Sequence, residues 1–288
     1  MTSLGLSGGP TALRILLGSQ LRRLREGRGI SAQDAAKAIR GSESKISRIE
    51  LGRNAVREID VADLLSLYGV TDPAEREQML SLASQANRPG WWYRYNDILP
   101  SWFQAYIGLE EAAASIRVYE AQFIPGLLQT EAYTSAVLAL GDIPDEELER
   151  RAVLRKERQR RFVHGELQLW ALLEEEVLRR PVAGPKVMRE QLEHLLAASR
   201  KGHLVLQVIP RGVVGHAAPG GFSILRFDDA EMPDIVYVEQ LTSALYLDKR
   251  AEVDHYLLAM ERISIVAADP RASAGIVQAI WEETGSTT

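Results

Sequence analysis

The sequence predicts an α+β chain in two parts: an all-α head of five short helices over residues 11–86, and a larger α+β domain over 87–283 with a mostly antiparallel sheet. Through residue 86, apolar residues recur at helical spacing and polar caps separate short segments. Beyond residue 165 the apolar period becomes that of strands. The run NRPG at 87–90 interrupts the helical pattern and marks the expected boundary.

The two middle helices of the head have the clearest start and stop signals. Ser31 is a natural N-cap, and Asp34 three residues later completes a capping-box pattern for a helix over 32–39. Ser42 caps a helix over 43–50, and Gly52 occupies the position that ends it. The other head helices are predicted over 13–26, 58–68 and 74–86, the last after the cap Thr71-Asp72-Pro73.

The larger domain combines both periodicities. We expect the aromatic cluster 91–106 to pack in a core or domain seam rather than form a ligand box. The loop PGLLQT (125–130) precedes a helix that Thr130 would cap. Helices are predicted over 102–118, 128–140, 145–162, 185–200 and 249–267, and strands over 166–175, 203–210, 220–227 and 234–241.

The amino-acid composition excludes several classes of protein. The 288 residues are 46% hydrophobic and 25% charged, which is ordinary for globular protein. Cysteine is absent, which excludes disulfide frameworks and thiolate zinc sites and fits a reducing compartment. The N-terminus lacks a basic start before an apolar core, and no apolar run approaches membrane-spanning length. We therefore expect a cytoplasmic protein with no membrane partner.

The formal net charge of −5 is unevenly distributed. Residues 11–60 carry eleven Lys/Arg against six Asp/Glu, a net charge of +5, and the rest of the chain carries 23 against 33, a net charge of −10. A polyanion responds to the local charge, because charges beyond about one Debye length, roughly 8 Å at physiological salt, are screened. The acidic total is therefore compatible with nucleic-acid binding by the head.

The helix over 43–50 has one apolar and one polar side. Ile46 and Ile49 can pack against the thin preceding helix, which carries Ala35, Ala36 and Ala38. Two short helices, a tight turn and small residues at the crossing are what a DNA-reading helix-turn-helix needs. A solvated helix cluster is the alternative, but the caps, the alanines and the local charge together favour DNA binding. The predicted DNA-binding residues are Gln33, Ser42, Glu43, Ser44, Lys45, Ser47, Arg48, Arg53 and Asn54.

We expect some of these DNA-binding residues to contact bases and others to contact phosphates. Arg48 suits a guanine edge or a phosphate, and Ser44 and Ser47 suit bases or phosphates. The helix N-termini at Gln33 and at 42–44 favour phosphate, since such ends attract anions. Arg53 and Asn54, just beyond the helix, would reach the DNA backbone. When bound, the protein would be associated with the nucleoid.

The run ISAQDAAKAIRGSESKISRIELGR resembles the helix-turn-helix of the XRE family, the lambda-repressor and Cro type, over about residues 16–70. Ala36 matches the buried small position of that family, and Ile46 and Ile49 match its core positions. One departure concerns the turn. Arg40 stands where the family usually has the turn glycine, and Gly41 follows, so the turn must adjust.

The stretches WWYRYNDILPSWFQAYIGLEEAAASIRVYEAQFIPGLLQTEAY, LWALLEEEVLRRPVAGPKVMREQLEHLL and VYVEQLTSALYL resemble the C-terminal domain of an actinobacterial group of XRE regulators. The WhiJ-like regulators, often described as antitoxin-like, belong to that group. The resemblance covers about residues 90–270. It implies a small protein partner, encoded nearby, whose binding alters DNA binding.

The residues suggest a ligand or partner site in the larger domain. The glycine-rich loop 212–222 lies between two predicted strands and is able to close over a bound group. Glu239 is predicted to face a pocket, with Tyr237 on the opposite side of its strand. The candidate ligand or partner residues are His216, Phe222, Tyr237 and Glu239.

Enzymatic and metal chemistry are not expected. The five histidines have no metal-ligand spacing, and no Walker, GxSxG or GxGxxG pattern occurs, so we predict no metal, no cofactor and no catalytic residues.

The leading hypothesis is a sequence-specific transcriptional regulator. It would act as a homodimer on operator DNA, under control of a small partner protein or a ligand at the C-terminal domain. The alternative is an antitoxin-like interaction protein that sequesters a small partner and binds DNA for autoregulation.

Overall fold

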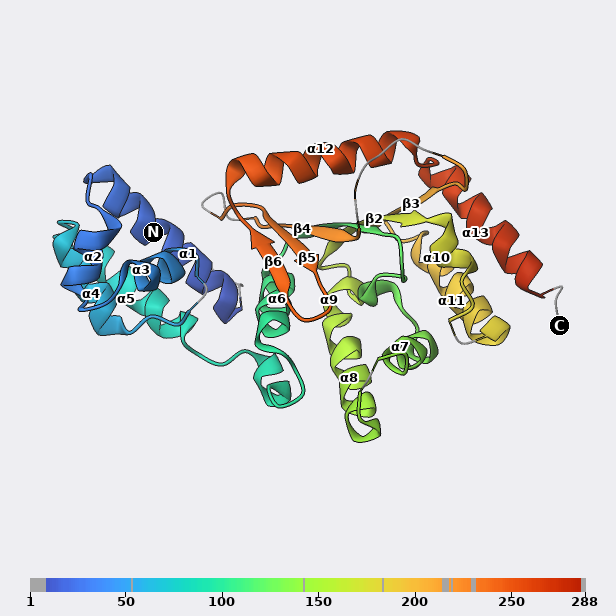
Figure 1. Cartoon of the computed structure of the whole chain (residues 1–288), viewed down its shortest axis with the longest axis horizontal. Helices are drawn as coiled ribbons and strands as arrows, with labels where there is room; N and C mark the ends of the chain where they lie inside the picture. The colour runs from blue at the N-terminus through green and yellow to red at the C-terminus, as the bar shows by residue number, and fades with distance from the viewer. Residues whose placement is uncertain are drawn as a thin grey trace. The chain divides into compact units, whose positions relative to one another are not determined.

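The computed structural model describes residues 9–52, 54–141, 143–182, 184–213, 218, 220–228 and 232–285. The chain divides into two compact units: an N-terminal unit, Met1–Ala112 with Asp228–Met232, and a C-terminal unit, Ala113–Phe227 with Pro233–Thr288. The first is helical and the second contains a mixed sheet, so the predicted α+β class is confirmed (Figure 1). The domain boundaries of 11–86 and 87–283 remain predictions.

The five predicted helices of the head are all present, with ends within a few residues of those expected. Ser31 and Ser42 cap α2 and α3 through their side chains, and Asp72 caps α5, so these three predictions are confirmed. A short 3-10 helix and a further α-helix follow. The elements are α1 (Pro10–Gly27), α2 (Ala32–Ala38), α3 (Glu43–Glu50), α4 (Glu58–Leu67), α5 (Pro73–Ala86), η1 (Trp91–Tyr95) and α6 (Ser101–Ala112).

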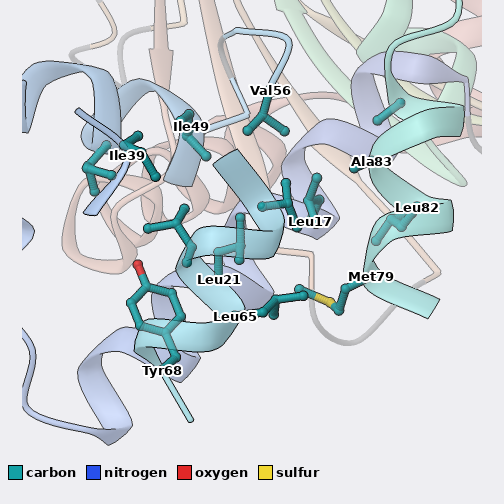
Figure 2. Close-up of a cluster of buried hydrophobic side chains, with 14 of the residues drawn as sticks. Leu17, Leu21, Ile39, Ile49, Val56, Leu65, Tyr68, Met79, Leu82 and Ala83 are labelled. Carbon is teal, nitrogen blue, oxygen red and sulfur yellow. The ribbon is translucent and has the colours of Figure 1, made fainter. Parts of the chain in front are cut away.

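One apolar cluster holds the N-terminal unit together. Side chains from α1, α3, α4 and α5 meet in it, among them Leu17, Ile49, Leu65 and Met79 (Figure 2). Each is at most 5% exposed. Complete burial of such a side chain contributes about 1.5–3 kcal/mol, so α3 is held by its apolar side and its polar side is left outward.

The aromatic cluster contributes core residues, as predicted. Trp92, Tyr95 and Tyr106 are each at most 7% exposed. At Gly108 of α6, a Cβ would lie 2.0 Å from Oγ1 of Thr11 in α1. The two helices therefore approach at a distance that only glycine permits.

The C-terminal unit is built on a six-stranded sheet in the order β3-β2-β1-β4-β5-β6. The β1–β2 and β2–β3 pairs are parallel and the other three pairs are antiparallel. The strands are β1 (Ser115–Glu120), β2 (Gln168–Glu174), β3 (Leu204–Ile209), β4 (Phe222–Arg226), β5 (Ile235–Glu239) and β6 (Ala244–Leu247). The four predicted strands and the antiparallel majority are confirmed.

The predicted helix over 102–118 is wrong beyond Ala112, because residues 115–120 form β1. This strand lies inside the sheet, with β2 on one side and β4 on the other, and its pairing overrides the local helical pattern. Neither β6 nor α13 was predicted. The helical elements of this unit are η2 (Gly126–Leu128), α7 (Glu131–Leu138), α8 (Asp145–Arg158), α9 (Arg160–Val163), α10 (Glu175–Arg179), α11 (Gly184–Ala198), α12 (Arg250–Val266) and α13 (Pro270–Gly285).

Helices cover both faces of the sheet. Helix α12 runs along one face, where Val253, Met260 and Ile263 join a core with sheet residues such as Ile224 and Val236. Figure 1 shows α7, α8 and α9 on the opposite side of the sheet. No helix in the described residues is both long enough and apolar enough to cross a membrane.

The PGLLQT loop is fixed by a buried glutamine from α11. The Gln191 Oε1 atom accepts from the backbone N–H of Thr130 at 2.6 Å, and its Nε2 donates to the Leu128 carbonyl at 2.7 Å. The Thr130 hydroxyl accepts from the backbone N–H of Tyr133 and caps α7, which confirms the predicted cap.

Candidate nucleic-acid interface

The turn between α2 and α3 is closed by two backbone hydrogen bonds. The N–H of Gly41 donates to the Ala36 carbonyl at 2.8 Å, and that of Arg40 donates to the Lys37 carbonyl at 3.1 Å. This is the Schellman arrangement, in which the residue after the C-cap adopts a left-handed conformation. Arg40 does so with φ 51°, and it is the one non-glycine residue of the described chain with positive φ. The turn therefore keeps the usual geometry although arginine replaces the usual glycine.

Helix α3 begins in the predicted register. The Ser42 hydroxyl accepts from the backbone N–H of Lys45 at 3.2 Å and lies 3.0 Å from the Ser44 hydroxyl. Ile46 and Ile49 are 1% and 3% exposed. The outward row of α3 consists of the exposed residues Glu43, Ser44, Ser47 and Arg48.

Arg48 is held within the outward row of α3. Its Nε donates to the Ser44 carbonyl at 3.1 Å, and its Nη2 lies 3.5 Å from the Ser44 hydroxyl. These contacts use the Nε and Nη2 groups of the guanidinium. The arginine therefore remains on the outward side of the helix with donors to spare, because a guanidinium carries five N–H groups.

Lys45 has a different environment from the rest of the predicted set. Its Nζ lies 2.8 Å from Oδ2 of Asp60, a carboxylate of α4 that is only 2% exposed. Arg57 completes the cluster with contacts of 3.1 and 2.6 Å to the same carboxylate. Burial raises the pKa of Asp60, but the hydrogen bonds from Arg57 and Lys45 outweigh it and hold that pKa below its usual value. The ammonium of Lys45 thus anchors α3 to α4.

A second ion pair fixes the other end of α3. Arg25 of α1 donates to both carboxylate oxygens of Glu50, from Nε at 2.6 Å and from Nη2 at 2.9 Å. Both side chains are nearly buried, at 12% and 8% exposed. A Cβ at Gly18 of α1 would lie 2.4 Å from the Ile49 carbonyl, so α1 and α3 cross in close contact.

The sequence pattern does not identify these anchoring residues. Asp60 and Arg57 come from the start of α4, and Arg25 and Glu50 lie 25 residues apart. In the sequence, Arg25 lies off the apolar stripe of its helix and Glu50 follows the core residue Ile49. Neither feature shows which residue its side chain will pair with, because the pairing depends on how the helices pack.

Gln33, Arg53 and Asn54 complete the predicted DNA-binding set. Gln33 is exposed in the first turn of α2, and Asn54 is exposed just after α3. Arg53 lies outside the described residues. The structure therefore gathers an exposed polar surface from α2, the turn and α3, whereas Lys45 is tied inward.

The structure separates the candidate ligand or partner residues of the larger domain. Phe222 is 4% exposed and lies 5.1 Å from the ring of Tyr256 in α12. Tyr237 pairs in register with Ser223, so it points to the other face of the sheet. His216 lies outside the described residues.

The expectation that Tyr237 and Glu239 lie on opposite sides of their strand is wrong. The Tyr237 hydroxyl donates to Glu239 Oε2 at 2.9 Å, as expected for two side chains on the same side of a strand.

Burial and, to a smaller extent, the charge of Glu239 raise the pKa of Glu120 to about 8. Within the described residues, no group of three or more His, Asp or Glu side chains is placed to hold a metal ion.

Comparisons with known proteins agree with this arrangement. Residues 16–79 match a helix-turn-helix domain; the range runs from within α1 to within α5 and includes α2, the turn and α3. Residues 103–279 match a domain of unknown function, DUF5753. No curated protein and no solved structure gave a match. Because the second match covers more than half of the chain, the protein belongs to the DUF5753 family.

Proposed function

We propose that this protein is a sequence-specific DNA-binding transcriptional regulator that reads operator DNA with α3. The helix-turn-helix match points to a DNA-binding regulator rather than an enzyme, and it favours that function over the antitoxin-like alternative. The observation that carries the proposal is the outward row of α3. Its residues are exposed while Ile46 and Ile49 hold the helix by its other side.

The outward row has the groups that major-groove recognition uses. Arg48 pairs with the O6 and N7 acceptors of guanine, and Glu43 accepts from the amino group of cytosine. Ser44 and Ser47 bind bases or phosphates. The first turn of α3, which Ser42 caps, directs its amide groups and the positive end of the helix dipole at a phosphate.

The regulator acts as a homodimer under this proposal. Two copies of α3 enter successive major grooves, about 34–36 Å apart along the DNA, and bind a roughly palindromic operator. Occupancy is controlled at the C-terminal domain by a small protein partner or a ligand. This assignment of roles is supported by the two family matches, since the DUF5753 match over residues 103–279 shares no residue with the helix-turn-helix match over residues 16–79.

Selection from random duplexes tests the proposal directly. We expect the full-length protein to enrich one motif with two related halves about one helical turn apart. On that motif, Arg48→Ala should cost about 1–3 kcal/mol, a factor of roughly 5 to 150 in Kd, and should relax the base preference at one position of each half.

Arg271→Ala is the matched control. Arg271 is an exposed arginine of α13 in the other unit, so its removal changes the total charge equally but should leave Kd within about twofold. Failure to enrich any motif contradicts sequence-specific binding. An equal effect of both substitutions removes Arg48 from the interface.

A further inference from the structure

A pocket of about 430 Å³ lies in the C-terminal unit between the sheet and α12. Its floor consists of Arg117 from β1, Trp170 from β2 and Arg226 from β4. Its wall is α12, which contributes residues 254, 257, 258 and 261. Sites for small molecules in proteins typically enclose about 300–1,000 Å³, so the size suits one small ligand.

Sheet register brings the floor together. Arg117 pairs directly with Trp170 across the β1–β2 ladder, so both side chains leave the sheet on the α12 face. The guanidinium carbon of Arg117 lies 5.3 Å from the centre of the Trp170 ring. Arg226 pairs with Ser115, two residues from Arg117 on the same face. The floor therefore contains two cations beside one large aromatic surface.

The indole of Trp170 is fixed in place. Its Nε1 donates to Gln207 Oε1 at 2.9 Å, and Gln207 Nε2 donates to the Ala268 carbonyl at 3.0 Å. Ala268 lies in the connection between α12 and α13. Because these hydrogen bonds fix the indole before any ligand binds, less side-chain entropy is lost when a ligand packs against its flat face.

Arg117 is the arginine of the floor for which no ion pair occurs among the described residues. It is half-buried, and within the described residues its guanidinium donates no hydrogen bond. Burial lowers the pKa of Arg117, the neighbouring charge of Arg226 lowers it further, and Asp234 offsets only part of this. Arg226 itself is paired with Asp234 at 3.0 Å. An anion placed beside Arg117 supplies the charge and the acceptors that this side chain lacks.

The wall combines apolar surface with carboxylates at its rim. The four wall residues follow i, i+3, i+4 and i+7 spacing and so form one stripe of α12. Leu257 and Leu258 are the apolar centre of that stripe. Asp254 is neutralised by Arg250 at 2.9 Å, and Glu261 is exposed. The pocket therefore has carboxylates on its helix side, and the Asp234 carboxylate pairs with Arg226 at its floor.

We propose that this pocket binds a small organic carboxylate with a flat apolar body. The carboxylate accepts hydrogen bonds from Arg117, beside the Arg226–Asp234 ion pair. The apolar body lies against Trp170 and the two leucines. That such a ligand acts as the effector of DNA binding rests on the proposed function; that the ligand binds does not.

A matched pair of probes tests the site on the full-length protein without DNA. 2-Naphthoate has the carboxylate and the flat body, and 2-naphthamide keeps the shape without the charge. We expect 2-naphthoate to bind at least tenfold more tightly than the amide, measured as Kd by ligand-observed NMR titration. Added salt should reduce this preference, because screening weakens the attraction to the arginines.

Substitutions locate the binding. Arg117→Gln should reduce the preference for 2-naphthoate to about twofold or less, and Arg117→Lys should retain part of it. Arg262→Gln is the control, since Arg262 is an exposed arginine of the same helix that does not line the pocket. Leu258→Asp, at a side chain 43% exposed, offers a second variant that does not disturb the sheet and should weaken both probes at least fivefold.

Several outcomes overturn the proposal: no binding of either probe, equal binding of both, or a preference unchanged by Arg117→Gln. A further measurement separates this proposal from the proposed function. If 2-naphthoate binds as expected while the protein enriches no DNA motif, the ligand site is supported and the proposed DNA-binding function is contradicted. If a motif is enriched and neither probe binds, the DNA-binding function is supported and the ligand site is contradicted.

Discussion

At the residue scale, Arg40 combines an unusual backbone with an ordinary structural task. It occupies the position after the C-cap of α2 with φ 51°, where a side chain costs roughly 1–2 kcal/mol relative to the right-handed region. Glycine has no such cost, which is why it dominates this position in helices generally. Arg40 is also exposed, so its side chain contributes no core packing that would offset the cost.

Arg40→Gly should therefore raise the stability of the N-terminal unit. We expect a gain of about 0.5–1 kcal/mol, reduced from the full conformational cost because glycine also makes the unfolded chain more flexible. The matched control is Lys37→Gly, three residues earlier inside α2, which should lose about 1 kcal/mol. Urea denaturation of the full-length protein measures both. Destabilisation by both substitutions contradicts the assignment of strain to Arg40.

The caps show what a residue pattern specifies by itself. Ser31, Ser42 and Thr130 each accept the expected backbone hydrogen bond, because capping depends on residues only two or three positions apart. The side of a strand on which a residue lies likewise depends only on its position relative to neighbouring residues. The two-residue period of a strand places Tyr237 and Glu239 on the same side, as their hydrogen bond shows, so this feature follows from the sequence alone.

At the element scale, α3 is fixed by its contacts to two other helices. Asp60 of α4 holds Lys45 near the N-terminus of α3, and Arg25 of α1 holds Glu50 at its C-terminus. Both anchoring carboxylates are at most 8% exposed as side chains. Removing one partner of such a pair leaves the other without compensation.

Asp60→Asn should lower the free energy of unfolding of the N-terminal unit by about 2 kcal/mol, the typical value of hydrogen bonds to a buried charge. The pKa of Asp60 is depressed in the folded protein, so its ionic contribution is present at neutral pH and is lost as the pH falls through that depressed pKa. Urea denaturation at pH 7 and under acidic conditions measures the difference.

The difference between Asp60→Asn and the native protein should therefore shrink toward low pH. Glu77→Gln on the exposed side of α5 serves as the control and should change stability by at most about 0.5 kcal/mol. A pH-independent cost for Asp60→Asn argues that packing, rather than charge, accounts for its effect.

Elements differ in how far the sequence specifies them. The helices of the head were predicted because glycines, caps and apolar periodicity delimit each one locally. Residues 115–118 of β1 fall within the helix predicted over 102–118, because no glycine or proline separates β1 from α6. The strand pairing of β1 depends on β2 and β4, which are distant in sequence. The α12 pocket was missed for the same reason, since Arg117 and Arg226 meet only through sheet register.

At the scale of the whole molecule, the charge distribution determines how the protein should respond to salt. The surplus of five positive charges in residues 11–60 lies where the helix-turn-helix is, and the remainder of the chain is acidic. Each phosphate neutralised by the protein changes the slope of log K against log salt by about −0.9. Total charge contributes little, because distant charges are screened.

We expect DNA affinity to fall with salt at a slope of roughly −4 to −5 per bound head, if about five phosphates are neutralised. Fluorescence anisotropy with the selected operator, between low and physiological salt, measures this slope. Glu282→Gln in α13 reduces the acidity of the remainder and should leave the slope unchanged. An affinity independent of salt contradicts the proposed contact with the DNA backbone.

The anchoring of α3 has a consequence for how binding preference can change. The side chains that hold the helix, Ile46, Ile49 and Glu50, are distinct from the outward side chains Glu43, Ser44, Ser47 and Arg48. On the proposed function, substitution at these four surface positions would change the preferred DNA sequence without repacking the core of the head. Lys45 is the exception, since its replacement would also release Asp60. On the same proposal, a change of target would require new side chains at the outward positions of α3, and the buried contacts that hold the helix could stay as they are.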